Sequence, residues 1–331
     1  MALKARLNQL TTFVKNATKR YEIILIQIVI NSSAIYYFYR MARVLITGGT
    51  GLVGKRLTQM LIAKNHEVLI LSRNPKKKNE FRWDVSSNYV DEKALINTDY
   101  IIHLAGAGIA DERWSKKRKQ VIIDSRVETA NLLFDKITSL NIKLKGFISA
   151  SGIGYYGAVN SEIIFEETAK VGTDFLGKTC EKWEQAAHQF STQNIPVTIL
   201  RTGIVLAKKG GALDKMKTPI ITPIGSGKQY IPWIHIDDLC HLYIAAIEDN
   251  LIGVFNAVAP EHHTSISFSK ALAKNFKRPY LGIGVPGSLL KILFGEMSVI
   301  LLTGSRISTK KIEKNKYSFR FAKLHEALSN L

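Results

Sequence analysis

Three glycines, each three residues from the next, lie in the segment TGGTGLVG at 47–54. These glycines, Gly48, Gly51 and Gly54, follow a short apolar run. A stretch with helical apolar spacing begins at Gly51. In such a turn one glycine reverses the chain, one lets the backbone approach a pyrophosphate, and one lets helix and strand pack closely. The free N–H groups at the start of the helix then bind phosphate. The order strand, turn, helix therefore predicts a dinucleotide site.

The end of the next apolar run indicates which dinucleotide is bound. A site for NAD usually has Asp or Glu there to bind the ribose hydroxyls. The segment HEVLILSRNP at 66–75 has Ser72 and Arg73 instead. A hydroxyl and a guanidinium suit a 2′-phosphate, because Arg donates charge-assisted hydrogen bonds to that group. We predict NADP as the cofactor in preference to NAD; the alternative is that Arg73 is a solvated loop residue before Pro75.

Strands and helices that must position these residues alternate along the chain. Short apolar runs predict strands at 42–47, within 66–75, at 100–104 and at 144–149, and helical spacing covers about 51–64 and 116–140. This alternation predicts an α/β fold with a doubly wound parallel sheet of the Rossmann type. Ligands of such sheets bind at the carboxyl ends of the strands, near which Gly106, Ser125, Arg126 and the segment 149–151 fall.

The composition supports a globular protein with an anionic ligand. The chain has 331 residues, of which 46% are hydrophobic, so it can bury a substantial core and is not a disordered tail. The formal net charge of +19 comes from scattered short runs at 76–78, 116–119 and 310–311. Such runs are more typical of solvated faces, and of attraction for an anionic ligand, than of a nucleic-acid surface. We expect a small-molecule substrate and no nucleic acid.

The chain has two cysteines, Cys180 and Cys240, which are far apart and form no CxxC pair. This pattern indicates neither a disulfide framework nor a metal site. It fits a reducing compartment, and we expect a cytoplasmic protein. Cys180 has an apolar helical context, which favours a small core residue over a nucleophile.

Residues 1–40 differ from the rest of the chain. Residues 1–20 carry five basic residues and no acid, and residues 23–39 carry no charge. Together they resemble a basic region followed by a signal anchor or interfacial helix, although the apolar run is at the short edge of the roughly 17–25 residues that span a bilayer. An extra strand is a second interpretation. We favour a third, in which Met41 is the functional start because MARVLITGG begins a strand directly; a membrane partner is expected only if residues 1–40 are retained.

Five motifs, in order, carry a resemblance to a known family: TGGTGLVG, HLAGAGI, SASGIGYYG, LRTGIVL and GSGKQYIPWIHIDDL. They resemble the extended short-chain dehydrogenase/reductase superfamily, in particular its epimerase-like branch of nucleoside-diphosphate-sugar epimerases. The segment 285–308 resembles the start of a small C-terminal domain of unknown function in that branch. The resemblance implies an NADP-binding Rossmann domain at 41–205, a mixed sheet and substrate lobe at 206–280, and a small helical domain at 281–331.

The resemblance also implies the residues that bind NADP(H). They are Thr47, Gly48, Gly49, Thr50, Gly51, Leu52, Val53, Gly54, Ser72, Arg73, Leu104, Ala105 and Gly106. In the segment WIHIDDL, His235, Asp237 and Asp238 could form a metal or acid-base cluster. The superfamily favours a milder role, in which Asp237 or Asp238 caps the helix that begins there.

Short-chain dehydrogenases use a Tyr as general acid/base, a Lys four residues later that lowers the pKa of that Tyr, and a Ser that hydrogen-bonds the substrate oxygen. Ser151 fits the Ser, with Ser149 as a second candidate. The Tyr-x-x-x-Lys pair is missing, because the helix expected at 174–190 has no tyrosine. Placing Phe175 at the Tyr position puts Thr179 at the Lys position.

Replacement acids lie near Ser151. Tyr155 is the freer candidate, because Tyr156 begins a Tyr-Gly pair that the superfamily often uses structurally. Glu166 and Glu167 are loop carboxylates that could serve instead, and an aromatic or anionic substrate could be bound by Trp114, Arg118, Lys228 or Trp233. We predict an NADP-dependent oxidoreductase or epimerase-like enzyme with Ser151 and Tyr155 as catalytic residues. The alternative is an NADP(H)-binding regulatory protein with little or no turnover.

Overall fold

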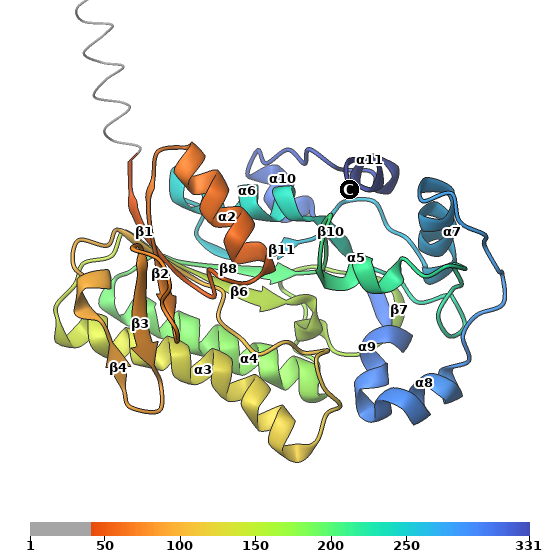
Figure 1. Ribbon diagram of the computed structural model, residues 1–331, viewed down its shortest axis with the longest axis horizontal. Helices are drawn as coiled ribbons and strands as arrows, with labels where there is room; N and C mark the ends of the chain where they lie inside the picture. Colours follow the sequence, from red (N-terminus) through yellow and green to blue (C-terminus); the bar gives the residue numbers. More distant parts are fainter. Residues whose placement is uncertain (1–40) are drawn as a thin grey trace, which may run out of the picture. The chain divides into compact units, whose positions relative to one another are not determined.

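The computed structural model describes residues 41–331, of which 43–331 form one compact unit (Figure 1). Its centre is an eight-stranded sheet with the strand order β11-β8-β6-β5-β1-β2-β3-β4. The strands are β1 (Arg43–Thr47), β2 (Glu67–Ser72), β3 (Glu80–Asp84), β4 (Tyr89–Val90), β5 (Tyr100–His103), β6 (Gly146–Gly152), β8 (Val197–Thr202) and β11 (Gly253–Ala257). All neighbouring pairs are parallel except β3 and β4.

Helices cover both faces of this sheet. On one face lie α2 (Leu52–Ala63) and α6 (Ile236–Glu248), and on the other lie α3 (Lys116–Ser139) and α4 (Phe175–His188) (Figure 1). Because both faces are covered, the central strands are mostly apolar: Leu45, Ile101 and Phe147 have no exposed surface. The predicted doubly wound sheet is confirmed. The strands and helices predicted from apolar spacing are found within one or two residues of their expected bounds, except that β6 ends three residues after the predicted 144–149.

The sheet changes winding direction at β1. The chain runs from β1 outward through β2 and β3, and then returns to β5 on the other side of β1. In doubly wound sheets, ligands bind at the carboxyl ends of the strands at this switch point. The glycine-rich turn, which directly follows β1, lies there.

A smaller lobe is built from the remaining elements. Two short parallel pairs are β9 (Ile204–Leu206) with β10 (Trp233–His235), and β7 (Asn160–Phe165) with β12 (Gly304–Ile307). The other elements of this lobe are α5 (Gly211–Met216), α7 (Ser265–Asn275), α8 (Gly287–Phe294), α9 (Val299–Leu302), α10 (Lys310–Lys314), α11 (Leu324–Asn330) and the 3₁₀ turn η4 (Gly295–Ser298). The 3₁₀ turns η1 (Glu92–Ala94), η2 (Ile153–Tyr156) and η3 (Gln189–Gln193) belong to the main sheet unit, in whose core Ala94 and Phe190 lie.

The C-terminal segment is tied to the rest of the unit. Asp238, in the first turn of α6, accepts hydrogen bonds from the backbone N–H groups of Arg320 at 2.8 Å and Phe321 at 2.9 Å. Leu324 and Leu328 of α11 are buried in a core cluster of the smaller lobe. The segment 281–331 also contributes the strand β12, and β11 of the segment 206–280 belongs to the main sheet, so elements cross both proposed boundaries.

Within residues 41–331, no helix is both long enough and apolar enough to cross a membrane. The expectations for residues 1–40, including the membrane anchor, lie outside the described residues.

Candidate functional site

The glycine-rich turn leaves no room for side chains at two positions. Gly48 has φ +69°, and a Cβ built there would lie 2.9 Å from the backbone carbonyl of Leu104. A Cβ on Gly54 would lie 2.4 Å from the Gly48 carbonyl oxygen. Gly51 is the N-cap of α2, where no side chain caps the helix and no acid lies in the first turn. The first N–H groups of α2 are therefore without a side-chain partner and suited to a phosphate.

The predicted cofactor segments meet at the carboxyl edge of the sheet. The hydroxyl oxygen of Thr47, at the end of β1, accepts hydrogen bonds from the backbone N–H groups of Leu104 and Ala105, both at 3.1 Å. Thr47–Gly54 and Leu104–Gly106 thus follow the ends of the neighbouring strands β1 and β5. Leu52 and Val53 form the first turn of α2.

Ser72 is the last residue of β2, the other neighbour of β1 in the sheet, and Arg73 follows it. Strand β2 pairs with β1 in parallel, so Ser72 lies at the same edge as the turn. Its hydroxyl oxygen accepts a hydrogen bond from the Asn74 N–H at 3.2 Å. Arg73 is exposed and makes no hydrogen bond or ion pair with the described residues 41–331. Its guanidinium is free to receive an anion.

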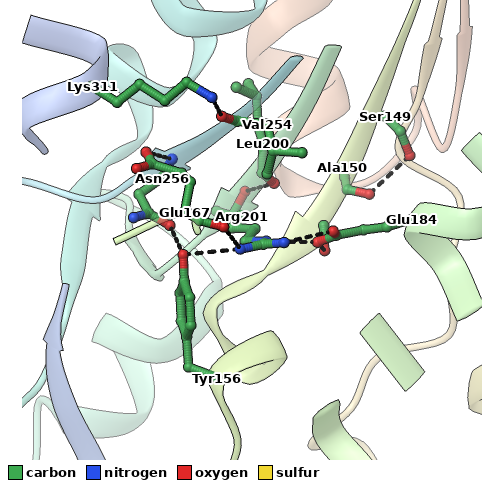
Figure 2. A network of polar contacts seen from close by, with 12 residues as sticks. Ser149, Ala150, Tyr156, Glu167, Glu184, Leu200, Arg201, Val254, Asn256 and Lys311 are labelled. Atoms are coloured by element: carbon green, nitrogen blue, oxygen red, sulfur yellow. Dashed lines mark hydrogen bonds and ion pairs between the residues drawn. The ribbon is translucent and has the colours of Figure 1, made fainter. Parts of the chain in front are cut away.

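Ser151 is bonded into a buried ion pair. Its side chain donates a hydrogen bond to Glu184 Oε1 at 2.7 Å, and the residue is only 4% exposed. Glu184 forms a two-pronged pair with Arg201, at 2.8 and 2.9 Å (Figure 2). Burial works against the charge of Arg201, but the hydrogen bonds and charge of Glu184 outweigh it and raise the pKa of Arg201. Ser149, the second candidate, donates to the Ala150 carbonyl at 2.9 Å.

The two tyrosines of η2 have different environments. Tyr156 donates to Asn256 Oδ1 at 2.6 Å and accepts from Arg201 Nη1 at 3.1 Å (Figure 2). Burial raises its pKa to about 12, so this phenol serves structure. The ring of Tyr155 lies on Arg201, whose Cζ is 3.3 Å from the ring centroid. Within residues 41–331 the Tyr155 hydroxyl has no hydrogen-bond partner.

The other sequence candidates either make contacts within the protein or are exposed. Glu167 accepts from the Asn256 N–H at 2.9 Å, and its carbonyl accepts from Arg201 at 3.0 Å. Glu166 lies 3.9 Å from Lys310 and is exposed. The indoles of Trp114 and Trp233 donate to the carbonyls of Ile109 and Glu261, Arg118 pairs with Asp111 and Glu112, and Lys228 is exposed.

Phe175 and Thr179, which stand at the Tyr and Lys positions of the expected motif, are engaged in contacts within the protein. Phe175 packs edge-on against Trp114 at 4.8 Å between ring centroids, and Thr179 is buried and donates to the Phe175 carbonyl at 2.6 Å. Leu176 and Cys180 instead meet the end of β6: a Cβ on Gly154 would lie 3.3 Å from Leu176 Cβ, and one on Gly152 would lie 3.7 Å from Cys180 Sγ. One residue turns the helix by about 100°, which moves a side chain to a different face.

Cys180 offers no proton at neutral pH. Burial raises the pKa of its thiol to about 11, and the negative charge of Glu184 adds to this effect. The face of α4 that meets β6 therefore presents an aliphatic side chain and an un-ionised thiol.

His235, Asp237 and Asp238 have separate roles. His235 is the N-cap of α6, because its Nδ1 accepts from the Asp237 N–H at 3.1 Å. The expectation that an Asp caps this helix is wrong, since both lie inside its first turn. Asp237 binds Arg56 at 2.7 and 2.9 Å, and Asp238 binds the C-terminal segment. No group of three metal-ligating side chains occurs in the described part of the chain.

Three residues of this buried network, Glu184, Arg201 and Asn256, were not among the candidates predicted from the sequence. Arg201 lies in the motif LRTGIVL and Glu184 near the end of the amphipathic stretch 174–184, so both stood in segments already recognised. A charged residue at the carboxyl end of a buried strand is the signal that could have identified Arg201, because such a charge needs a partner.

A doubly wound parallel sheet with an uncapped, glycine-rich turn at its switch point defines a Rossmann-type NAD(P)-binding protein. The family model described as the NAD dependent epimerase/dehydratase family matches residues 44–257, and a domain of unknown function, DUF1731, matches residues 285–331. The chain belongs to the NAD dependent epimerase/dehydratase family. The predicted resemblance is confirmed, including its C-terminal domain.

Relatives match nearly their full length. The chain is 33% identical to mouse epimerase family protein SDR39U1 over 297 residues, covering 87% of the chain and 99% of the relative. The structure of human SDR39U1 (isoform 2) with NADPH superposes with a TM-score of 0.79 at 32% identity, over 87% of this chain and 98% of that one. A Bacillus cereus UDP-glucuronic acid 4-epimerase solved with UDP-glucuronic acid and NAD, at 21% identity and TM-score 0.68, covers 86% and 96% and shares the fold.

Proposed function

We propose that this chain is an NADP(H)-dependent oxidoreductase or epimerase-like enzyme that acts on a small molecule. The observation that carries the proposal is the uncapped start of α2, with the unpartnered Arg73 at the same edge of the sheet. The turn suits the pyrophosphate, and Ser72 with Arg73 suits a 2′-phosphate. That human SDR39U1 was solved with NADPH supports the preference for NADP over NAD.

We propose Tyr155 as the proton donor of this enzyme. When bound, the nicotinamide supplies the hydride, and the protein must exchange a proton with the substrate oxygen. Tyr155 follows the end of β6 and its hydroxyl has no partner within residues 41–331, whereas Tyr156 is held by Asn256 and Arg201. Of the two phenols, Tyr155 is therefore the available one.

For Ser151 we propose a supporting part in the same site. Its hydroxyl binds Glu184, which holds Arg201, and the ring of Tyr155 lies on that guanidinium. To donate a hydrogen bond to a substrate carbonyl oxygen, the Ser151 hydroxyl would have to leave Glu184. In its present position Ser151 acts on catalysis by fixing the residue beneath Tyr155.

The cofactor preference is tested by titrating NADPH and NADH against protein fluorescence. Arg73→Met should weaken NADPH binding about tenfold or more, because a charge-assisted hydrogen bond is lost, and should leave NADH binding unchanged. Lys77→Met removes an exposed charge from the same loop and is the matched control. Equal affinity of the wild type for both cofactors, or for neither, would rule out the proposed role of Ser72 and Arg73.

The proton donor is tested by NADPH oxidation across a panel of carbonyl compounds. Tyr155→Phe keeps the ring on Arg201 and removes the hydroxyl, so turnover should fall roughly 10²–10⁴-fold while the melting temperature is unchanged. Tyr89→Phe, at an exposed tyrosine, is the control. Turnover that is indifferent to both Tyr155→Phe and Ser151→Ala would mean that other groups carry out the chemistry.

The second candidate function is an NADP(H)-binding regulatory protein with little or no turnover. Leu176 and Cys180 favour it, because the face of α4 that meets β6 has no acid-base pair. Wild-type protein that binds NADPH tightly but oxidises it with no compound of the panel would support this function over the enzyme.

We also propose a cytoplasmic location, supported by two free, buried cysteines that fit a reducing compartment. Cell fractionation with mass spectrometry of the amino terminus tests it. A chain that begins at Met1 and is recovered with membranes would contradict it.

A further inference from the structure

Arg126 lies at the carboxyl edge of the sheet, between two proposed parts of the site. Its guanidinium stands against the backbone of the 104–106 loop: a Cβ built on Gly106 would lie 3.0 Å from Arg126 Cζ and 3.2 Å from both Nη atoms. On another side Cζ lies 4.8 Å from the ring of Trp183, on α4. The side chain thus fills the space between the loop after β5 and the helix α4.

All acceptors that Arg126 finds in the protein are neutral. Its Nη1 donates to the carbonyls of Ala107 at 3.0 Å and Ile122 at 2.8 Å, and reaches Ser125 Oγ at 3.5 Å. Within residues 41–331, Nη2 and Nε have no hydrogen-bond partner and no carboxylate forms an ion pair with this side chain. Three of its five N–H groups are therefore unused.

Other arginines near the site are neutralised. Arg118, two turns earlier on the same helix, pairs with Asp111 at 3.6 Å and Glu112 at 3.4 Å. Arg201 pairs with Glu184 at 2.8 Å. Arg126 thus differs from both in having no counter-charge.

Arg126 nevertheless carries its charge. Burial lowers its pKa to about 10, an effect that Cys180 partly offsets and Arg118 increases, so the guanidinium is protonated at neutral pH. A charge partly removed from water without a counter-ion costs free energy. An aromatic face and two carbonyls compensate for part of this cost, and an anionic ligand would compensate for the rest.

The position of Arg126 fits such a ligand. The Leu104 carbonyl and Ala105 N–H lie against Gly48 of the glycine-rich turn, and Gly106 is the next residue of this loop. The same guanidinium lies over the ring of Trp183 on α4, the helix whose Cys180 faces Gly152 at the end of β6. A molecule that extends from the turn toward the end of β6 passes within reach of Nη2 and Nε.

We propose that Arg126 is an anion-binding residue of this site, which receives a phosphate or carboxylate group at Nη2 and Nε. The proposal builds on the proposed binding of a nicotinamide cofactor and adds the chemical class of the group that must lie next to it. The oxyanion belongs either to the cofactor, as a phosphate, or to the substrate.

Two measurements on the purified chain distinguish these sources. The first is the Kd of NADPH by fluorescence, and the second is the shift in melting temperature that inorganic phosphate causes in NADP-saturated protein at constant ionic strength. Both are made for the wild type, Arg126→Met and Lys117→Met, which removes an exposed charge from the same helix.

A cofactor phosphate at Arg126 predicts that Arg126→Met raises the Kd of NADPH about tenfold or more, with Lys117→Met unchanged. A substrate anion predicts an unchanged Kd and a phosphate-induced shift that is lost in Arg126→Met alone. If both quantities in Arg126→Met equal those of Lys117→Met, the proposal is wrong. A wild type that binds no NADPH refutes the proposed function, and the phosphate measurement on the cofactor-free chain then decides the role of Arg126.

Arg126→Lys keeps the test decisive if Arg126→Met does not fold. A point charge replaces the planar fork, so an anion-binding role predicts a weakened response to NADPH or phosphate. A role limited to holding the Ala107 and Ile122 carbonyls predicts reduced stability with both responses intact, and would overturn the proposal.

Discussion

His103, at the end of β5, is a buried neutral base. Its Nε2 lies 2.9 Å from Thr129 Oγ1, and its Nδ1 accepts a long hydrogen bond, 3.5 Å, from the indole of Trp183. Burial lowers the pKa of His103 to about 3, and the charge of Arg126 adds to this effect. The imidazole therefore supports Trp183, and through it Arg126, without carrying a charge at neutral pH.

Acid should destabilise the protein through His103. Below the ordinary pKa of 6.5, the His103 imidazole binds a proton in the unfolded chain but stays neutral in the folded chain. The contribution of the neutral His103 to the free energy of unfolding is complete above pH 6.5 and is lost as the pH falls toward 3. By pH 5 the loss is about 2 kcal/mol. Urea unfolding at pH 7 and pH 5 measures it. Between pH 7 and pH 5, His103→Gln should lose less stability than the wild type. His325→Gln, at an exposed site, should lose as much as the wild type. Equal losses in all three proteins would contradict the assignment.

Single residues were predictable from the sequence where the mechanism is local. The glycine turn was recognised because its strand, turn and helix are contiguous. The partners of Ser151 and Arg201 were not, since Glu184 is 33 residues from the first and 17 from the second. A charged residue in an apolar strand, such as Arg201, indicates that a counter-charge is required. Which of several acids supplies that charge depends on tertiary packing.

At the level of elements, the β1–α2 turn is the part with the least tolerance. Gly54→Ala would place a methyl group 2.4 Å from the Gly48 carbonyl oxygen and 2.6 Å from Gly49 Cα, so the turn must open. We expect NADPH affinity to fall roughly ten- to a hundredfold, in line with the cost of overpacking. In Gly51→Ala the new methyl group would lie 3.2 Å from one atom, the Gly48 carbonyl oxygen, so this variant should lose less NADPH affinity. Fluorescence titration with circular dichroism compares them, and similar affinities for both variants would show that this packing does not matter.

Long and apolar elements were predictable, and short or polar ones were not. Apolar spacing predicts β1, β2, β5 and β6 because strands buried on both faces are continuous apolar runs. It gives no sign of β7 (NSEIIF) or β12 (GSRI), which pair only because the C-terminal segment returns to lie beside residues 160–165. The helix α4 was predictable from its amphipathic spacing, but that spacing does not show which of its side chains meet the end of β6.

At the scale of the whole molecule, residues 285–331 should be indispensable for folding. A chain ending at residue 284 loses the buried side chains of Phe321, Leu324 and Leu328, and leaves Asp238 buried without its two N–H partners. Each loss costs several kcal/mol, comparable in sum with the roughly 5–15 kcal/mol that stabilises a whole protein.

The truncated chain is therefore expected to lack a cooperative thermal transition by circular dichroism and to be digested rapidly by protease. A chain ending at Leu328, which keeps these contacts, is the control. A truncated chain that melts cooperatively near the temperature of the full-length chain would show that the C-terminal segment is an independent appendage.

The two hydrogen bonds from the Arg320 and Phe321 backbone to Asp238 also bear on how the protein is made. Domains tend to fold from the amino terminus as the ribosome delivers them, at about 5–20 residues per second. Here the carboxylate in the first turn of α6 is synthesised some eighty residues before its partners. The nucleotide-binding half can therefore collapse first, whereas the smaller lobe cannot complete its packing until residues 320–328 have left the ribosome.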